Sequence, residues 1–277
     1  MFGVVDLHTH TICSDGRLTP RALVQKASEK GLRGLAITDH DTIAGLAEGA
    51  AVARRKGLHF IPGVELSITL KGREVHVLAY GIDPSSPVLA QYFERLRQIR
   101  EARAQEILEQ LAREKVPVSW EVVTQIAGHA PVGRPHIAQA LVESGQVSSY
   151  QEAFARYLGD HAPAGLPKKN PSPEEAFAVI REAGGCAVLA HPGNWTSEED
   201  IQVLVAYGLW GIEVWHPSHD VGLVHYYTAL AKRYQLVPTG GSDYHGRHAY
   251  EEENFGRYGV SLAQIQSWDT CAHFINC

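Results

Sequence analysis

The chain has 277 residues, of which 44% are hydrophobic and 20% are charged, and this composition excludes a largely disordered protein. Its net charge of −6 provides no bulk positive charge for coating nucleic acid, although a local site could still bind a small phosphate substrate. Because no signal peptide is visible and no apolar run approaches membrane-spanning length, we expect a cytoplasmic protein.

Seven short apolar runs have the character of strands that are buried on both faces of a parallel sheet, since they show little polar alternation. These runs are 4–8, 34–39, 60–65, 74–80, 187–191, 211–215 and 237–243. Capping and stop signals predict helices from Pro20 to Gly31, over 43–56, from Pro173 to Gly184, from Ser197 to about Gly208, and over 223–234. Alternating strands and helices favour an α/β fold built on a parallel sheet or barrel. Between the third and fourth strands the chain is too short for a crossover helix, so we expect a hairpin-like irregularity there.

The middle of the chain breaks this alternation, because no convincing strand occurs between about residues 87 and 169. A long charged helix is predicted over 86–114, followed by shorter helices over 120–127, 135–143 and 150–158. We therefore expect a first barrel part at 1–86, an all-helical insertion at 87–169, and a second barrel part at 170–277.

Every predicted strand carries His, Asp or Glu at or near its carboxyl end. In chain order these residues are His8 with His10, His40, Glu65, His76, His191, Glu213 with His216, and Asp243 with His245. The carboxyl ends of all strands in a parallel barrel open on one face, where catalytic groups collect. Imidazole and carboxylate together suit Zn²⁺, Mn²⁺ or Fe²⁺. A cluster of this size exceeds the needs of one ion, and sites with several ions typically activate water and clamp phosphoryl oxygens.

The spacing of His8 and His10 favours a pair of metal ligands, whereas Asp15 and Glu213 each have two competing interpretations. The spacing of His8 and His10 places both rings on the same side of an extended strand, where they can bind one ion. Asp15, in the sequence "SDG", could be a further ligand or simply part of a turn. Glu213 could be a structural carboxylate or a group that supports a ligand, and we leave it outside the ligand set.

The motifs "DLHTHTICSDG", "ITDHD", "PGVELS", "AHP" and "GSDYH" follow one another along the chain. As a set they resemble the successive motifs of the PHP (polymerase and histidinol phosphatase) superfamily. This resemblance implies a distorted (β/α)₇ barrel and metal-dependent hydrolysis of phosphate esters. In the insertion, "GRPHIAQAL" resembles the bacterial branch that removes the 3′-phosphate from nucleoside 3′,5′-bisphosphates and trims short RNA from its 5′ end. The insertion would then cover the active-site face.

The resemblance also implies three divalent metal ions, with Mn²⁺ the expected identity and Fe²⁺ or Zn²⁺ as alternatives. Glu65 would take part in binding two of them. The implied ligands are His8, His10, Glu65 and Asp243 for the first ion, Glu65, His76 and His191 for the second, and Asp15, His40 and His245 for the third. A metal-bound hydroxide would then attack phosphorus.

An anionic substrate needs cationic or hydrogen-bonding side chains to hold it. The candidates are Arg134, Lys168, Lys169, His216 and His219. By resemblance Arg134 reaches a phosphate, although it could merely begin a helix; the two lysines could be a solvated pair, and His219 could be a helix start. Asp41, next to His40, is a candidate supporting carboxylate or proton shuttle, and His216 is a second candidate for catalysis.

Two other functions remain open at this point. A histidinol-phosphate phosphatase would share the barrel, but the helical insertion argues against it. A non-catalytic metal-binding or polymerase-associated module is disfavoured because no expected ligand position is missing. The expected partner is a small nucleotide or short RNA substrate, with no membrane and no stable complex with double-stranded nucleic acid.

Overall fold

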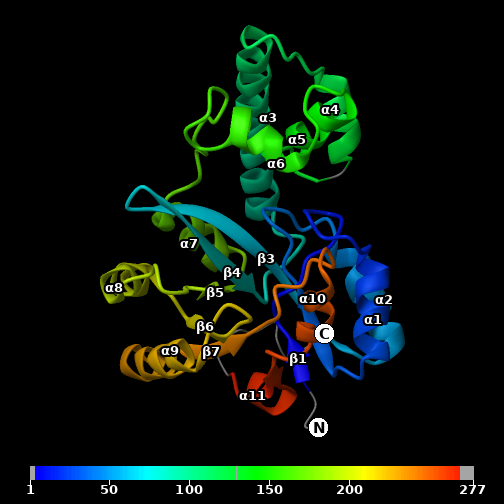
Figure 1. The fold of residues 1–277 in the computed structure, drawn as a ribbon. Coiled ribbons are helices and arrows are strands. Elements are labelled where there is room, and N and C mark those ends of the chain that lie inside the picture. Colours follow the sequence, from blue (N-terminus) through cyan, green and yellow to red (C-terminus); the bar gives the residue numbers. More distant parts are fainter. Residues whose placement is uncertain (1–3, 129, 269–277) are drawn as a thin grey trace. The chain divides into compact units, whose positions relative to one another are not determined.

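The computed structural model describes residues 4–128 and 130–268. These residues form two compact units (Figure 1): the barrel unit, which comprises the described residues up to Ala90 and from Asn170 onward, and the helical unit, Gln91–Lys169. Within the described ranges, no helix combines the length and the apolar character needed to cross a bilayer.

An eight-stranded sheet forms the centre of the barrel unit, in the order β7-β6-β5-β4-β3-β2-β1-β8. Its strands are β1 Val4–Asp6, β2 Gly34–Ile37, β3 His59–Leu70, β4 Arg73–Tyr80, β5 Cys186–Leu189, β6 Gly211–Trp215, β7 Val237–Gly240 and β8 Val260–Ser261. The prediction of an α/β fold with a distorted barrel is confirmed. The short β8, which pairs antiparallel with β1, was not predicted because two residues carry too little pattern.

The predicted parallel arrangement is wrong at β4, which runs antiparallel to both β3 and β5, but the hairpin-like irregularity predicted between the third and fourth strands is confirmed. Only Lys71 and Gly72 connect β3 to β4, and both have positive φ angles, 48° and 79°, as a tight hairpin requires. His76 pairs in register with Ser67 of β3. Its position in the first half of an antiparallel strand therefore brings His76 to the same end of the barrel as the carboxyl ends of the parallel strands.

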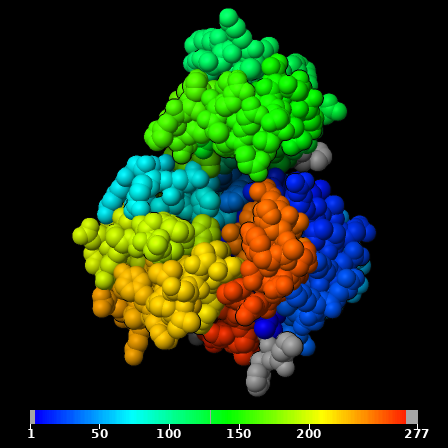
Figure 2. Space-filling view, viewed as in Figure 1, coloured from blue at the N-terminus to red at the C-terminus, as the bar shows by residue number. Residues whose placement is uncertain are grey.

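The segments that follow β1 and β7 lie side by side at this end of the barrel. Thr9 and Tyr244 form an isolated parallel bridge, and the N–H of His10 donates to the carbonyl of Tyr244 at 2.9 Å. In Figure 2 the orange segment after β7 lies directly against the blue N-terminal part of the chain. Residues more than 230 positions apart are thus brought side by side where the candidate ligands emerge.

Gly241 permits this close approach, because a Cβ atom there would lie 2.3 Å from the Cβ of His8 and 2.5 Å from its backbone nitrogen. We expect Gly241→Ala to lower the free energy of unfolding by about 1–3 kcal/mol, since the backbone of His8 must move. Urea denaturation measures this change. Gly133→Ala is the control, because its Cβ would meet nothing closer than 3.4 Å. Equal stability of the two variants would contradict the packing argument.

Seven described helices accompany the strands of the barrel unit, and several lie around the outside of the sheet (Figure 1). They are α1 Pro20–Glu29, α2 Leu46–Lys56, α7 Pro173–Glu182, α8 Glu198–Tyr207, α9 Val221–Tyr234, α10 Ala249–Asn254 and α11 Leu262–Gln266. Thr19, Ser172 and Ser197 cap α1, α7 and α8 as their sequence signals predict. Helix α2 begins three residues later than predicted, and α10 and α11 were not predicted.

The helical unit has a core of its own. Its elements are α3 Pro87–Arg113, which begins in the barrel unit, α4 Trp120–Ala127, α5 Arg134–Glu143, α6 Tyr150–Ala153 and the π-helix η1 Phe154–Leu158. The helix predicted over 150–158 is therefore two short elements. Ile107, Leu111, Val123, Ile137 and Leu141 are almost completely buried at the centre. The division of the chain at residues 86/87 and 169/170 stays a prediction.

Candidate metal centre

The candidate ligands meet at one end of the barrel unit, on the loops after β1, β2, β5 and β7 and on β3 and β4. Within each of three sets, the ligand atoms all lie within 4.8 Å of one another. The sets are His8, His10, Glu65 and Asp243; His10, Asp15, His40 and His245; and His40, Glu65 and His76. His8, His10 and Glu65 are fully buried, whereas the side chains of the outer imidazoles remain 16–24% exposed, as at His245 and His40. The centre therefore has a buried floor and a side that solvent reaches.

Glu65 lies in the middle of the cluster and uses its two oxygens toward different groups of imidazoles. Its Oε2 lies 3.2 Å from Nε2 of His8, from Nε2 of His10 and from Nδ1 of His40. Its Oε1 lies 2.9 Å from Nδ1 of His76 and from Nε2 of His191. Burial opposes ionisation, but His40, His8 and His76 outweigh it and hold the pKa of Glu65 well below its usual range. This is the arrangement of a carboxylate that can bridge two cations.

Two aspartates complete the anionic part of the cluster. The Oδ1 of Asp243 lies 3.1 Å from Nε2 of His10 and 3.3 Å from Nε2 of His8. The Oδ1 of Asp15 lies 3.1 Å from Nε2 of His245, and its Oδ2 lies 3.1 Å from a guanidinium nitrogen of Arg247. Asp15 therefore lies within the cluster, and its role as a metal ligand stays a prediction. Burial opposes their ionisation as well, but the neighbouring imidazoles prevail and lower the pKa of both carboxyls.

Unsatisfied nitrogens indicate that these residues suit a cation. Nδ1 and Nε2 of His10, Nδ1 of His76 and Nε2 of His216 are buried and make no well-aligned hydrogen bond in the described part of the chain, although carboxylate oxygens lie close to three of them. Burial disfavours the charged form of His10 and His76, yet the nearby carboxylates raise the pKa of each to about 10. Burial lowers the pKa of His40 to about 3. Imidazole nitrogens and carboxylate oxygens crowded in this way are a donor set that divalent ions of the first transition row accept.

Glu213 lies behind the cluster and contacts two of its members. The Nδ1–H of His8 donates to Oε1 of Glu213 at 3.1 Å, which leaves Nε2 of His8 facing Glu65. The backbone N–H of His191, a residue with a φ of 24°, donates to Oε2 of Glu213 at 2.8 Å. Glu213 therefore fixes the tautomer of His8 and the strained backbone of His191. Of the two interpretations left open by the sequence, the geometry supports a carboxylate that positions ligands.

We expect Glu213→Gln to weaken metal binding about 10-fold to 100-fold, because an amide does not fix the His8 tautomer as a carboxylate does. Titration of metal into chelator-treated protein measures the change. Asp200→Asn is the matched control, since Asp200 is an equally buried carboxylate that pairs instead with Lys71 and Arg73. Unchanged metal affinity in Glu213→Gln would show that the carboxylate is only structural.

The remaining candidates of the barrel unit differ in what their polar atoms contact. The Oδ1 of Asp41 accepts from the backbone N–H of Ser67 at 3.0 Å, which ties the loop after β2 to β3. The Nε2 of His216 lies 3.6 Å from Oδ2 of Asp243, at the border of the cluster. In His219, Nδ1 donates to a carbonyl at 2.9 Å and Nε2 accepts from a backbone N–H at 3.1 Å. Neither ring nitrogen of His219 is left for a substrate, so this geometry does not support the predicted contact.

The other three substrate-binding candidates belong to the helical unit. The Nη1 of Arg134 donates to the carbonyl of Leu158 at 2.9 Å and to a carboxylate oxygen of Asp160 at 2.7 Å. Lys168 and Lys169 are exposed, in a segment without regular secondary structure. Contact with a substrate stays a prediction for Arg134, Lys168 and Lys169.

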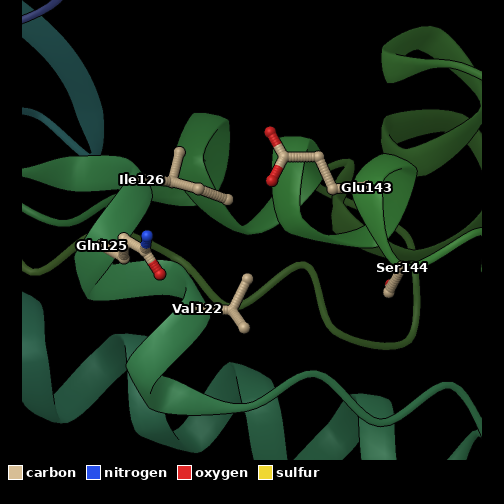
Figure 3. A pocket seen from close by; sticks show the side chains of 5 residues that line it. All are labelled: Val122, Gln125, Ile126, Glu143 and Ser144. Atoms are coloured by element: carbon tan, nitrogen blue, oxygen red, sulfur yellow. The ribbon is translucent and has the colours of Figure 1, made fainter.

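A surface pocket of the helical unit offers no comparable chemistry. Val122, Gln125 and Ile126 of α4 and Glu143 and Ser144 at the end of α5 line it. Figure 3 shows the side chains of Glu143 and Ile126 near one another, with Val122 below them. This lining contains one carboxylate and no imidazole or thiol, so the pocket lacks the donor set of a transition-metal site.

Residues 6–162 match the sequence profile of the PHP domain family. The chain belongs to the PHP family. The prediction from the motifs is thereby confirmed, and with it the class of protein, an enzyme that hydrolyses phosphate esters.

Two curated relatives of this PHP chain are each 36% identical to it. One is the "5'-3' exoribonuclease Rnm" of Escherichia coli K12, matched over 249 residues, 87% of this chain and 85% of the relative. Another is the "3',5'-nucleoside bisphosphate phosphatase" of Chromobacterium violaceum, matched over 247 residues, 87% of each chain. Among solved structures, a protein assigned as a metal-dependent phosphoesterase from Bifidobacterium adolescentis superposes with a TM-score of 0.79 at 33% identity, covering 94% of this chain and 98% of that one.

Proposed function

We propose that this PHP-family phosphoesterase removes the 3′-phosphate from nucleoside 3′,5′-bisphosphates and also trims short RNA from its 5′ end. The observation that carries the proposal is the position of Glu65, whose two oxygens face separate groups of imidazoles. A carboxylate placed between two groups of imidazoles would suit a centre with several metal ions, the kind that hydrolyses phosphate esters. The two relatives named for these activities support the choice of substrate. The proposed partner is thus a nucleotide or short single strand, and the proposed location is the cytoplasm.

We infer that three divalent ions, Mn²⁺ in the first instance, occupy the centre. Two of the three ligand sets predicted from the family resemblance agree with sets of atoms that lie close together around Asp243 and around His245. The remaining set pairs Glu65 with His76 and His191, which both lie 2.9 Å from its Oε1. Ligand types alone do not select Mn²⁺ over Fe²⁺ or Zn²⁺, so metal add-back decides the identity.

Divalent ions held there would provide a strong nucleophile from water and neutralise charge on the phosphoryl oxygens. The chain's own residues do the remaining work. Glu65 holds the imidazoles in two groups, and Glu213 keeps His8 in the tautomer whose Nε2 faces inward. His216, with Nδ1 beside the hydroxyl of Ser218 at 2.7 Å, has its Nε2 directed at the border of the cluster. It is therefore placed to give a proton to the leaving alcohol. A catalytic role for Asp41 stays a prediction.

Phosphate release from adenosine 3′,5′-bisphosphate and from histidinol phosphate, measured in parallel with metals added back to chelator-treated protein, tests the proposal. We expect release from the bisphosphate, with adenosine 5′-monophosphate as the other product. Preference for histidinol phosphate would contradict the proposed substrate, and no release from any phosphate ester would favour a non-catalytic module.

Arg134→Ala should raise KM for the bisphosphate by about tenfold with little change in kcat, because a phosphate contact made before and during reaction contributes mainly to binding. Steady-state kinetics measures both constants. Arg156→Ala is the control, since Arg156 is an exposed arginine of the same unit that pairs with Glu152. An unchanged kcat/KM in Arg134→Ala would contradict a phosphate contact and would mean that Arg134 only contacts Leu158 and Asp160.

A further inference from the structure

One loop of the barrel unit carries both a candidate ligand and an exposed indole. The loop joins β5 to α8, with His191 near its start and Trp195 four residues later. Trp195 is 56% exposed, although its large apolar surface favours burial. Trp195 belongs to none of the ligand motifs, and no step of the proposed mechanism involves it.

The ring of Trp195 rests on Gly193 through one face. A Cβ atom built on Gly193 would lie 2.4 Å from Cη2, 2.5 Å from Cζ3 and 2.6 Å from Cζ2 of the indole. Three adjacent ring atoms at nearly equal distances place that Cβ above the ring face, since an approach to the ring edge would bring one atom much closer than its neighbours. Gly193 also has a φ of 55°, so both its backbone and its missing side chain suit this contact. The exposed area of Trp195 therefore lies on its other face and its edges.

Buried side chains hold the backbone under the ring in place. The N–H of Gly193 donates to Nε2 of His219 at 3.1 Å, and the hydroxyl of Tyr227 donates to the Gly193 carbonyl. The carbonyl of Trp195 itself accepts from Nη1 of Arg73 at 2.7 Å. His219 is 7% exposed and Tyr227 is fully buried. The backbone that carries and supports the indole is thus held in place before any ligand arrives, which reduces the entropy lost on binding.

The loop is also close to the metal centre. His191 and Trp195 are four residues apart, and four residues span at most about 14 Å. His219, which holds Gly193, has its ring centroid 5.6 Å from that of His216, and Nε2 of His216 lies 3.6 Å from Asp243. The distance therefore permits the base of a nucleotide to reach Trp195 while its phosphate is bound at the centre.

The geometry points to Trp195 as a stacking platform for the base of the nucleotide substrate, an inference that rests on the proposed function. An aromatic platform accepts any nucleobase, because every base has a π-face. Trp195 would then provide affinity for nucleotides over phosphate esters that lack a base, with little choice among the four bases. Each stacked base would improve binding about 5-fold to 100-fold.

Calorimetric titration of the metal-loaded protein with adenosine 5′-monophosphate and with ribose 5-phosphate tests this inference without requiring turnover. We expect Trp195→Ala to weaken binding of adenosine 5′-monophosphate about 5-fold to 100-fold and to leave binding of ribose 5-phosphate within about twofold. Trp195→Phe should restore most of the loss. Tyr207→Ala, which removes an exposed aromatic residue at the end of α8, should change neither affinity.

Equal weakening of both ligands, or no weakening of either, would overturn the platform. The platform would also be overturned if Trp195→Ala kept its nucleotide affinity but lost a co-purifying protein, because the indole would then bind a protein. If the wild-type protein binds adenosine 5′-monophosphate as described but releases no phosphate from the bisphosphate, the proposed function fails and the platform stands. If the wild-type protein releases phosphate from the bisphosphate but Trp195→Ala binds adenosine 5′-monophosphate with unchanged affinity, the platform fails and the proposed function stands.

Discussion

Glu65→Gln should slow phosphate release by at least about a thousandfold while the protein remains folded, a loss of about 4 kcal/mol of transition-state stabilisation. An amide keeps the shape of the side chain but offers only one oxygen to the imidazoles that now share two. Five imidazole nitrogens, from His8, His10, His40, His76 and His191, lie within 3.2 Å of the carboxylate of Glu65. The loss should therefore affect binding of more than one ion.

Initial rates of phosphate release and metal content per chain, measured on the same preparation, check this result. Glu48→Gln is the control, because Glu48 is an exposed carboxylate that pairs with Arg21 on the surface. Normal turnover in Glu65→Gln would refute its position at the centre of the reaction.

Removal of metal should lower Tm markedly, and restoring the metal should raise it again. The cluster places His8, His10 and Glu65 in full burial, and both ring nitrogens of His10 make no well-aligned hydrogen bond there, which is costly without a cation. A ligand that binds only the folded state stabilises it by about 4 kcal/mol at a thousand times its dissociation constant. Each further ion that binds should increase this stabilisation of the folded state.

Thermal unfolding of chelator-treated protein, followed during back-titration with Mn²⁺, Fe²⁺ and Zn²⁺ in separate experiments, checks the second result. The metal that raises Tm at the lowest concentration should also be the one that best restores phosphate release. A Tm that does not respond to any of the three would mean that the buried imidazoles and carboxylates satisfy one another.

The sequence predicted that the candidate ligands would lie together at one end of the barrel, because strand-end position is a local property, and the structure brings them together there. His8 and His10 follow β1, His191 follows β5, and Asp243 follows β7, as a barrel with ligands at one end requires. The strand-end rule alone does not explain the position of His76, because that rule holds for parallel strands. The short connection predicted a hairpin-like irregularity, and the antiparallel course of β4 brings the first half of that strand to the ligands.

Contacts between distant segments were beyond the sequence. Glu213 lies in an apolar run that is consistent with any buried strand, and only the fold brings it to Nδ1 of His8 and the backbone of His191. The sequence around Trp195 also contains no pattern that indicates a binding site. The contact of its ring with Gly193 depends on the φ angle of Gly193 and on the hydrogen bond from the Gly193 N–H to His219. For His219 the sequence suggested a substrate contact, and the backbone partners of both ring nitrogens oppose it.

The most direct test of the metal centre is the rate of phosphate release from adenosine 3′,5′-bisphosphate as Mn²⁺ is added stepwise to metal-free protein. Binding by the three ligand sets predicts no release without metal, and activity that rises to a plateau near three equivalents per chain. Full activity in the metal-free protein, or no release at any concentration of Mn²⁺, Fe²⁺ or Zn²⁺, would contradict a metal-dependent phosphoesterase centre built around Glu65.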